Sequence, residues 1–416
     1  MKTIFLAAGR SSRMKPISDK NFLDFCGMPL IYHLLHNAHK GGLKNFIIVG
    51  NEDNIENIKT LCKEHSFLKE ATITMQSNLD EGMAGGIIEG LNFVTEEESV
   101  TILGGNDYVN PEIYQRILDE SAEWNGGILA KKMEKYFPGG YLEIDLDQRI
   151  QSIIEKPGEG NEPSEVVNIV VHHFNQALDI KLALKEAASS EDDTYEVALD
   201  ALFKSGRYKA IEYDDYWQAV KYPWHILELM DLILQQDPQA ILGDRIHEFQ
   251  EALPSVWIHN TCQGKVVTNG SNIIVDEGVK PYHNACISGP AYIGKNTTLG
   301  NNSLVRGSMI GHHSAVGFNT EVVRSYLSHN VTSHIAYIGD SVIDQEVNFG
   351  AYSCTANLRF DKRTVRVEVK GEKIDSGMNK LGAIVGAGAQ IGIHASIMPG
   401  AKIDPGEFVT PSAFEK

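Results

Sequence analysis

Aliphatic residues recur every six positions in the last third of the chain, and this repeat restricts the possible folds more than any other feature. The spacing covers two blocks separated by one five-residue step and returns near the end of the chain: Ile287, Ile293, Leu299 and Val305; Ile310, Val316 and Val322; Val385, Ile391, Ile397 and Ile403. Glycine follows the aliphatic residue at 294, 300, 311, 317, 386 and 392. Each such hexapeptide forms one flat side of a triangular coil, with its aliphatic residue inward and a small residue at the corner. The repeat predicts a parallel β-helix and disfavours the alternative, a glycine-rich antiparallel β domain.

The first 220 or so residues instead alternate short apolar runs with amphipathic stretches. Four runs have the length and composition of buried strands: Thr3–Ala8, Phe46–Gly50, Thr72–Gln76 and Val100–Leu103. Two stretches between them, Pro29–His39 and Asn54–His65, carry helical apolar spacing. This alternation predicts an α/β fold with a Rossmann-like, mostly parallel sheet covered by helices. Three later runs predict further strands near one sheet edge: Gly126–Ala130, Gly140–Ile144 and Ile150–Glu155.

A chain of 416 residues is too long for one ordinary domain. Pro223–Gln236 has a strong helical apolar pattern with proline near both boundaries, which predicts a connecting helix. We therefore expect an α/β domain at 1–222, a connecting helix and linker at 223–254, and the β-helix at 255–416. Leu358–Lys380 breaks the repeat and should form an excursion from the coil.

The charge balance excludes some classes of partner. Aspartate and glutamate number 55 against 37 lysines and arginines, a formal net charge of −18. Nucleic acids and anionic membranes both reward a basic surface, so general affinity for either is not expected. No apolar window approaches the length of a membrane span. The five cysteines are scattered without a CxxC pair, which argues against a disulfide framework and fits a cytoplasmic location.

Four cations nevertheless gather just after the first predicted strand: Arg10, Arg13, Lys15 and Lys20. The preceding loop, Leu6-Ala7-Ala8-Gly9, has small side chains that let an anion approach its backbone N–H groups. Together these features predict a polyphosphate site. On charge alone, a polar surface loop is the alternative.

The same stretch, LAAGRSSRMKP followed by SDKNFLDFCGMPLI, resembles the signature of sugar-1-phosphate nucleotidyltransferases. The resemblance implies that the loop binds a nucleoside triphosphate and that Arg13 and Lys20 act on the phosphates. Ser11-Ser12 and Asn21 depart from the usual residues of that signature. Further motifs in the order of this family imply the other site residues: Leu6, Ala7, Ala8, Gly9, Gln76, Gly82 and Met83 for the nucleotide; Asp107 for Mg²⁺; Gly140, Glu155 and Asn168 for the sugar.

One departure concerns the metal. The family places a second ligand just before the connecting helix, and Ala219 stands at that position here. Asp214 or Asp215 could replace it, or Asp107 could hold Mg²⁺ together with substrate phosphates. In the implied reaction, a sugar-1-phosphate oxygen attacks the α-phosphorus and displaces pyrophosphate. Mg²⁺ and the two cations would offset the repulsion between the anionic reactants.

The β-helix carries a second resemblance, to glucosamine-1-phosphate acetyltransferase domains, in the segments SHIAYIGD, NFGA and TAN. It implies that His334 is the general base for the attacking amine, a role that suits an imidazole with an ordinary pKa near 6.5. Other implied residues are Arg306, Tyr337, Asn348 and Asn357 for the amino sugar phosphate and Ala351 for acetyl-CoA. The alternative is that the histidines of this region are only polar corners of the coil.

The excursion resembles the ANLRxD…DSGxxKLGA pattern of archaeal-type bifunctional sugar-1-phosphate nucleotidyltransferase/acetyltransferases. That family implies a left-handed parallel β-helix, acetyl transfer from acetyl-CoA, and a homotrimer. UTP and N-acetylglucosamine-1-phosphate are the favoured substrates. Two alternatives stay open: a monofunctional nucleotidyltransferase whose β-helix only oligomerises or regulates, and a non-catalytic nucleotide-sugar sensor.

Overall fold

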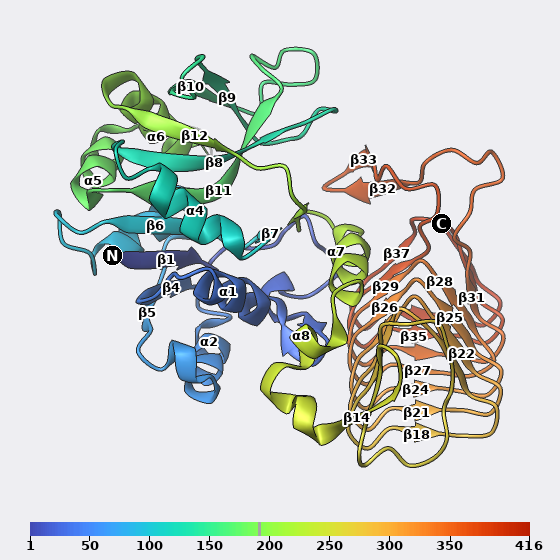
Figure 1. Cartoon of the computed structure of the whole chain (residues 1–416). Helices are drawn as coiled ribbons and strands as arrows, with labels where there is room; N and C mark the ends of the chain where they lie inside the picture. The colour runs from blue at the N-terminus through green and yellow to red at the C-terminus, as the bar shows by residue number, and fades with distance from the viewer. Residues whose placement is uncertain (190–192) are drawn as a thin grey trace. The chain divides into compact units, whose positions relative to one another are not determined.

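The computed structural model describes residues 1–189 and 193–416, which form two compact units (Figure 1). The first unit comprises Met1–Arg10 and Ile31–Ala219, and the second comprises Ser11–Leu30 and Val220–Lys416. The short segment Ser11–Leu30 therefore folds with the C-terminal part of the chain. Among the described residues, no helix has both the length and the apolar composition that crossing a membrane requires.

A nine-stranded sheet forms the centre of the first unit. Its strands lie in the order β10 (Ile150–Glu155), β9 (Gly140–Ile144), β11 (Val166–Phe174), β6 (Val100–Gly104), β1 (Lys2–Leu6), β4 (Phe46–Gly50) and β5 (Thr72–Met75), with β8 (Gly126–Lys132) beside β11 and β12 (Tyr208–Glu212) beside β8. The strands β6, β1, β4 and β5 pair in parallel, whereas β11, β9 and β10 pair antiparallel. The predicted mostly parallel α/β fold is confirmed, and the later strands lie toward one edge as expected.

Helices connect these strands, as a parallel sheet requires. They are α1 (Leu30–Lys40), α2 (Ile55–Glu64), α3 (Gly82–Leu91), α4 (Glu112–Glu120), α5 (Ala177–Glu186) and α6 (Thr194–Ser205), with short 3₁₀ turns η2 (Ser66–Leu68) and η3 (Leu79–Glu81). The two helices predicted from apolar spacing are confirmed as α1 and α2. In α2, the buried residues Ile58, Leu61 and Cys62 occupy one face at helical spacing. A separate two-stranded ribbon pairs β7 (Asp107–Val109) with β13 (Trp217–Ala219).

The second unit contains a left-handed parallel β-helix with three sheets, seen as stacked coils in Figure 1. Sheet 1 contains β14 (Phe249–Leu253), β15 (Val256–His259), β17 (Ile273–Val275), β20 (Ala291–Ile293), β23 (Met309–Ile310), β26 (Tyr326–Leu327), β29 (Val342–Ile343), β34 (Ile384–Val385) and β37 (Lys402–Ile403). Sheet 2 contains β16 (Val267–Asn269), β19 (Cys286–Ser288), β22 (Leu304–Arg306), β25 (Glu321–Val323), β28 (Tyr337–Gly339), β31 (Cys354–Thr355), β36 (Ser396–Ile397) and β39 (Phe414–Glu415). Sheet 3 contains β18 (Lys280–Pro281), β21 (Thr298–Leu299), β24 (Ala315–Val316), β27 (Thr332–Ser333), β30 (Asn348–Phe349), β35 (Gln390–Ile391) and β38 (Phe408–Val409).

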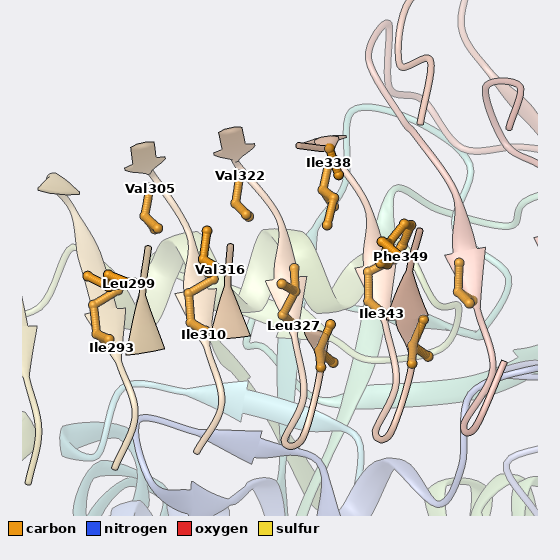
Figure 2. Close-up of a cluster of buried hydrophobic side chains, with 14 of the residues drawn as sticks. Ile293, Leu299, Val305, Ile310, Val316, Val322, Leu327, Ile338, Ile343 and Phe349 are labelled. Carbon is orange, nitrogen blue, oxygen red and sulfur yellow. The ribbon is translucent and has the colours of Figure 1, made fainter. Parts of the chain in front are cut away.

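The interior of the coil confirms the hexapeptide prediction. All of the predicted inward positions belong to one buried hydrophobic core, and Figure 2 shows residues such as Ile293, Ile310 and Ile343 pointing into it. The strand pairing places each aliphatic residue on its counterpart one coil later, for example Ile293 opposite Ile310. The corner residues have little space: a Cβ on Gly311 would lie 2.5 Å from the carbonyl carbon of Ser328 in the next coil. Glycine is required there because the neighbouring backbone approaches so closely.

The remaining elements of the second unit precede or interrupt the coil. The predicted connecting helix is confirmed as α7 (His225–Leu234), and α8 (Pro238–Leu242) and η4 (Gly243–Glu248) follow it. The predicted excursion contains an antiparallel hairpin, β32 (Arg366–Val369) and β33 (Glu372–Asp375). The segment Ser11–Leu30 contributes η1 (Lys20–Phe22) and a second small hairpin, β2 (Asp24–Phe25) and β3 (Met28–Pro29).

Two phenylalanines of sheet 3 test the packing of the coil. Phe349 is fully buried in the core, whereas Phe408 is 79% exposed. Phe349→Ala should lower the free energy of unfolding by about 3–5 kcal/mol, because it removes buried apolar surface and leaves a cavity. Phe408→Ala should change it by less than about 0.5 kcal/mol. Denaturant unfolding followed by circular dichroism measures both, and equal effects would contradict the assignment of Phe349 to the core.

Candidate active sites

The first candidate site begins at the loop that follows β1. Asn51 and Asn54 lie between β4 and α2, and their side-chain amides donate to the carbonyls of Ala8 and Ala7, each at 2.9 Å. These bonds fix the path of the predicted nucleotide loop Leu6–Gly9. A Cβ on Gly9 would meet nothing within 4 Å, so this residue borders open space. Gly9 is thus accessible to a ligand, while Ala7 and Ala8 are buried and fixed by the amides of Asn54 and Asn51.

Gln76 fixes the start of α3. Its side-chain nitrogen donates to the carbonyls of Asn78 at 3.0 Å and Gly82 at 2.9 Å. Gly82 has a φ of 55° and a ψ of −141°, a conformation that favours glycine. Met83 packs against the core of the unit. The structure thus brings the predicted nucleotide residues Gln76, Gly82 and Met83 together, with Gln76 acting on the backbone turn.

The carboxylate of Asp107 lies at the start of β7, directly opposite Ala219 of β13. Asp107 is buried, and its Oδ1 accepts a hydrogen bond of 2.9 Å from the indole N–H of Trp217. A side chain at position 219 stands beside Asp107, and this is the position at which the sequence resemblance implies a second metal ligand. In this chain that neighbour is a methyl group.

Asp215 has other partners. Its Oδ1 accepts from the backbone N–H of Tyr216 at 2.7 Å, and its Oδ2 accepts from the side chain of Asn110 at 2.6 Å. The described residues contain no group of three or more His, Cys, Asp or Glu side chains able to hold a metal ion. Asp107 alone therefore fits a Mg²⁺ that takes most of its other ligands from phosphates and water.

The three predicted sugar residues converge where β9 and β11 begin and β10 ends. Glu155 pairs with Gly140 across the β9–β10 ladder. A Cβ on Gly140 would lie 2.9 Å from Oδ1 of Asn168, so glycine is needed for that amide to approach. Lys156 pairs with Glu155 at 2.8 Å. A carboxylate and an amide beside a bare backbone turn make a site suited to binding hydroxyl groups.

Arg13 and Lys20 belong to the segment Ser11–Leu30 of the second unit. The guanidinium of Arg13 lies 5.8 Å from the ring centroid of Tyr222. Lys20 is buried, and its Nζ donates to the carbonyl of Val220 at 3.4 Å. Asp19 caps the η1 turn by accepting from the N–H of Asn21. Both cations therefore lie near the chain that leads into α7.

A second candidate site lies on the coil. His334 is exposed at the corner between β27 and β28, and in the described part of the chain its imidazole makes no hydrogen bond. Tyr337 of β28 accepts a 3.1 Å hydrogen bond from the side chain of Asn357. An exposed imidazole of this kind is available to a substrate, as a general base requires.

The residues predicted for acetyl transfer lie on two different sheets of the coil. Tyr337 and Arg306 belong to sheet 2, whereas Asn348 belongs to sheet 3, where its Oδ1 accepts from Thr332 at 2.7 Å. Ala351 lies at the corner after β30 and accepts from the N–H of His394. The structure thus separates Asn348 from Tyr337 by the corner between sheets 3 and 2, and that corner bears His334 and, one coil later, Ala351.

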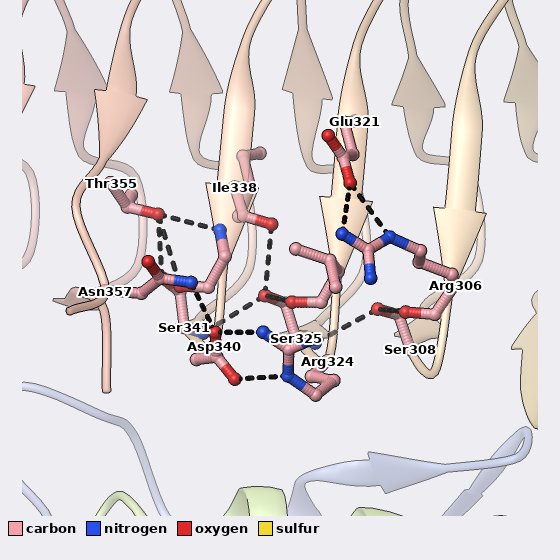
Figure 3. Close-up of polar contacts among 12 residues, drawn as sticks. Arg306, Ser308, Glu321, Arg324, Ser325, Ile338, Asp340, Ser341, Thr355 and Asn357 are labelled. Carbon is pink, nitrogen blue, oxygen red and sulfur yellow. Dashed lines mark hydrogen bonds and ion pairs between the residues drawn. The ribbon is translucent and has the colours of Figure 1, made fainter. Parts of the chain in front are cut away.

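Two arginine–carboxylate pairs lie on successive coils (Figure 3). Arg306 donates twice to Glu321, at 2.9 and 2.6 Å, and Arg324 donates to both oxygens of Asp340, at 2.6 and 2.7 Å. The hydrogen bond to Asp340 raises the pKa of Arg324 above its usual value. The sequence reasoning assigned no role to Arg324 or Asp340. The strand register offered no signal for Arg324, because Val323 is the residue one coil after Arg306.

With this geometry in place, comparison with known proteins identifies the chain. The nucleotidyl transferase family matches residues 2–235. A bifunctional sugar-1-phosphate nucleotidylyltransferase/acetyltransferase of Sulfurisphaera tokodaii is 30% identical over 93% of this chain and 90% of its own length. The bifunctional protein GlmU of Methanococcus maripaludis is 28% identical over 93% of this chain and 87% of its own. That of Methanocaldococcus jannaschii is 26% identical over 93% and 88%.

The chain is a nucleotidyl transferase by family, because that family covers more than half of its length. The bifunctional relatives match 93% of the chain, so their similarity extends into the coil. The protein belongs to the bifunctional sugar-1-phosphate nucleotidylyltransferase/acetyltransferases, as the sequence motifs indicated.

The two arginine pairs should differ in their contribution to stability. Arg324→Ala leaves the carboxylate of Asp340, whose side chain is 6% exposed, without its charged partner. Loss of a partner from a buried charge should lower the free energy of unfolding by about 2–3 kcal/mol. Arg306→Ala breaks a pair in which both side chains are at least one-third exposed, so the loss should stay under about 1 kcal/mol. Unfolding midpoints in urea measure the difference, and a larger loss for Arg306→Ala would contradict this ranking.

Proposed function

We propose that the protein transfers a nucleotidyl group from a nucleoside triphosphate to a sugar-1-phosphate and releases pyrophosphate. UTP and N-acetylglucosamine-1-phosphate are the favoured substrates. The observation that supports this most directly is that Gly140, Glu155 and Asn168 lie close together. They belong to the same unit as Asp107 and the loop after β1. The family membership and the motif order agree with it.

Each group has a defined task in this proposal. Backbone N–H groups of the loop Leu6–Gly9 bind phosphate oxygens. Glu155 and Asn168 hold the sugar hydroxyl groups and orient the attacking phosphate. Arg13 and Lys20 neutralise charge on the triphosphate, which lowers the repulsion between the two anionic reactants.

Mg²⁺ would be held by Asp107, whose carboxylate stays oriented through the indole N–H of Trp217. When bound, the ion supplies positive charge and polarises phosphoryl oxygens. Because Ala219 offers no ligand, we propose that substrate phosphates and water complete its coordination. Asp215 supports this assignment, since its two oxygens already accept hydrogen bonds from the side chain of Asn110 and the backbone N–H of Tyr216.

Pyrophosphate release tests the assignment of Asp107. Asp107→Asn keeps an oxygen for the indole of Trp217 but removes the charge, so turnover should fall on the order of a hundredfold while the fold persists. Lys20→Ala should cause a loss of the same order. The matched control is Asp119→Asn on the exposed surface of α4, which should leave turnover unchanged.

The assay uses a panel of sugar-1-phosphates with each nucleoside triphosphate. Near-normal pyrophosphate release by Asp107→Asn would remove Asp107 from the site. No release by the unmodified protein with any pair would favour a non-catalytic sensor.

We further propose that the coil transfers an acetyl group from acetyl-CoA to an amino sugar phosphate, with His334 as general base. Tyr337, Asn357 and Arg306 would hold the acceptor. Asn348 lies on sheet 3, across the corner that bears His334 and Ala351. A homotrimer would let sheet 3 of one coil complete the site on sheet 2 of another, which supports the trimer expected for this fold.

Release of CoA tests this second activity. His334→Ala should lower it by about 10²–10⁴-fold, the usual contribution of a general base. The control is His313→Asn at another exposed corner, where asparagine tolerates the positive φ of 56° and activity should persist. If the unmodified protein releases no CoA with any amino sugar phosphate, the coil is a scaffold or a regulatory module. The cytoplasmic location and the functional division at 1–222, 223–254 and 255–416 remain proposals.

A further inference from the structure

Three outward-facing side chains on successive strands of sheet 1 are buried. Tyr292, Met309 and Tyr326 pair on the successive strands β20, β23 and β26. Their chain neighbours at 293, 310 and 327 point into the core, so these three residues point out of the coil. Each is nevertheless at most 2% exposed. Another part of the second unit must therefore cover this face.

The cover includes the hairpin β2–β3 of the segment Ser11–Leu30. The hydroxyl of Tyr326 donates to the carbonyl of Asp24 at 2.9 Å, and its ring lies 5.3 Å from that of Phe25. Burial raises the pKa of Tyr326 well above its usual value, which keeps the hydroxyl protonated as a donor. Phe25 is fully buried in this contact.

Other contacts extend the interface along the coil. The N–H of Cys26 points at the sulfur of Met309 at 3.4 Å. A Cβ on Gly27, which has a φ of 84°, would come within 2.9 Å of the hydroxyl of Tyr292. The hairpin therefore follows the surface of three coils closely, and a bulkier turn would not fit.

A second anchor lies on the other side of Lys20. The carboxylate of Asp344, just after β29, accepts a 2.8 Å hydrogen bond from the backbone N–H of Ser18. Asp344 is 2% exposed, so its negative charge is committed to this and the neighbouring backbone N–H of Gln345. Lys20 thus lies between two points, Ser18 and Asp24, that are both bonded to the coil.

We propose that Tyr326 and Asp344 are positioning residues for nucleotidyl transfer, because they anchor the segment that carries Lys20 to the coil. This inference rests on the function proposed for Lys20. The β-helix then contributes to nucleotidyl transfer by holding the segment of Lys20, whether or not it also transfers acetyl groups. Displacement of a charged group by about 1 Å can cost a hundredfold in rate, so loss of either anchor should be visible in turnover.

The first part of the test measures how firmly the segment 11–30 is held, independently of enzyme activity. Hydrogen–deuterium exchange of peptides from 11–30 is measured in the unmodified protein, in Tyr326→Phe and in Asp344→Ala. Exchange of these peptides should accelerate in both variants, while peptides from the coil core keep their protection. Asp344→Asn, which retains an acceptor oxygen, should restore most of the protection. The control is Lys402→Ala on β37, another residue of sheet 1, whose Nζ donates to the carbonyl of Glu368 in the excursion.

The second part measures pyrophosphate release by the same proteins. We expect kcat to fall about tenfold in Tyr326→Phe and in Asp344→Ala, recovery in Asp344→Asn, and no change in Lys402→Ala. Unchanged exchange in 11–30 would overturn the anchoring. Faster exchange with unchanged kcat would overturn the positioning role and leave the proposed function intact. Absence of pyrophosphate release from the unmodified protein would overturn the proposed function and the positioning role together, with the exchange data still reporting the anchor.

Discussion

The geometry of the coil is the constraint on which the second unit depends. Each flat side has room for one inward aliphatic residue, and every coil stacks that residue on its counterpart, as Ile293 stacks on Ile310. Because strand side chains alternate, the residues beside these inward positions must face outward. A slip of one residue would exchange the two sets, so the core that stabilises the coil also fixes where its functional side chains stand. On sheet 2 the outward set includes Tyr337 and Arg306, and on sheet 1 it includes Tyr326.

The sequence predicted the parts of the fold that depend on local spacing. The hexapeptide period, the excursion at 358–380 and the helices α1, α2 and α7 all follow from residues close together in the chain. The resemblance to known families supplied the candidate residues, among them Asp107, Glu155 and Asn168. It did not supply the pairing that explains them. Asp107 faces Ala219 only because β7 pairs with β13. These two strands are far apart in the sequence, so no local pattern predicts their pairing.

The contacts of Ser11–Leu30 are another case of long-range pairing that local sequence patterns do not predict. Asp24 bonds to Tyr326 and Ser18 to Asp344, in each case across about three hundred residues of chain. Spacing rules could place Tyr326 on the outside of the coil but could not say what covers it. One signal was present in the sequence: outward positions of a solvated coil favour polar residues, and Tyr292, Met309 and Tyr326 are three large apolar exceptions on adjacent coils. A run of such exceptions indicates a covered face.

The excess of carboxylates behind the net charge of −18 also affects the cations of the candidate sites. Several cations near the candidate sites already have carboxylate partners, and the cost of exchanging that partner for a phosphate depends on burial. Arg306 and Glu321 are both partly exposed, so their pair is weak and a phosphate can replace the carboxylate at little cost. Arg324 faces a buried Asp340, and drawing it away would leave an uncompensated charge in the coil. On the proposed function, Arg306 is therefore the cation that an anionic acceptor would recruit, whereas Arg324 bonds to Asp340, which in turn accepts from Asn357.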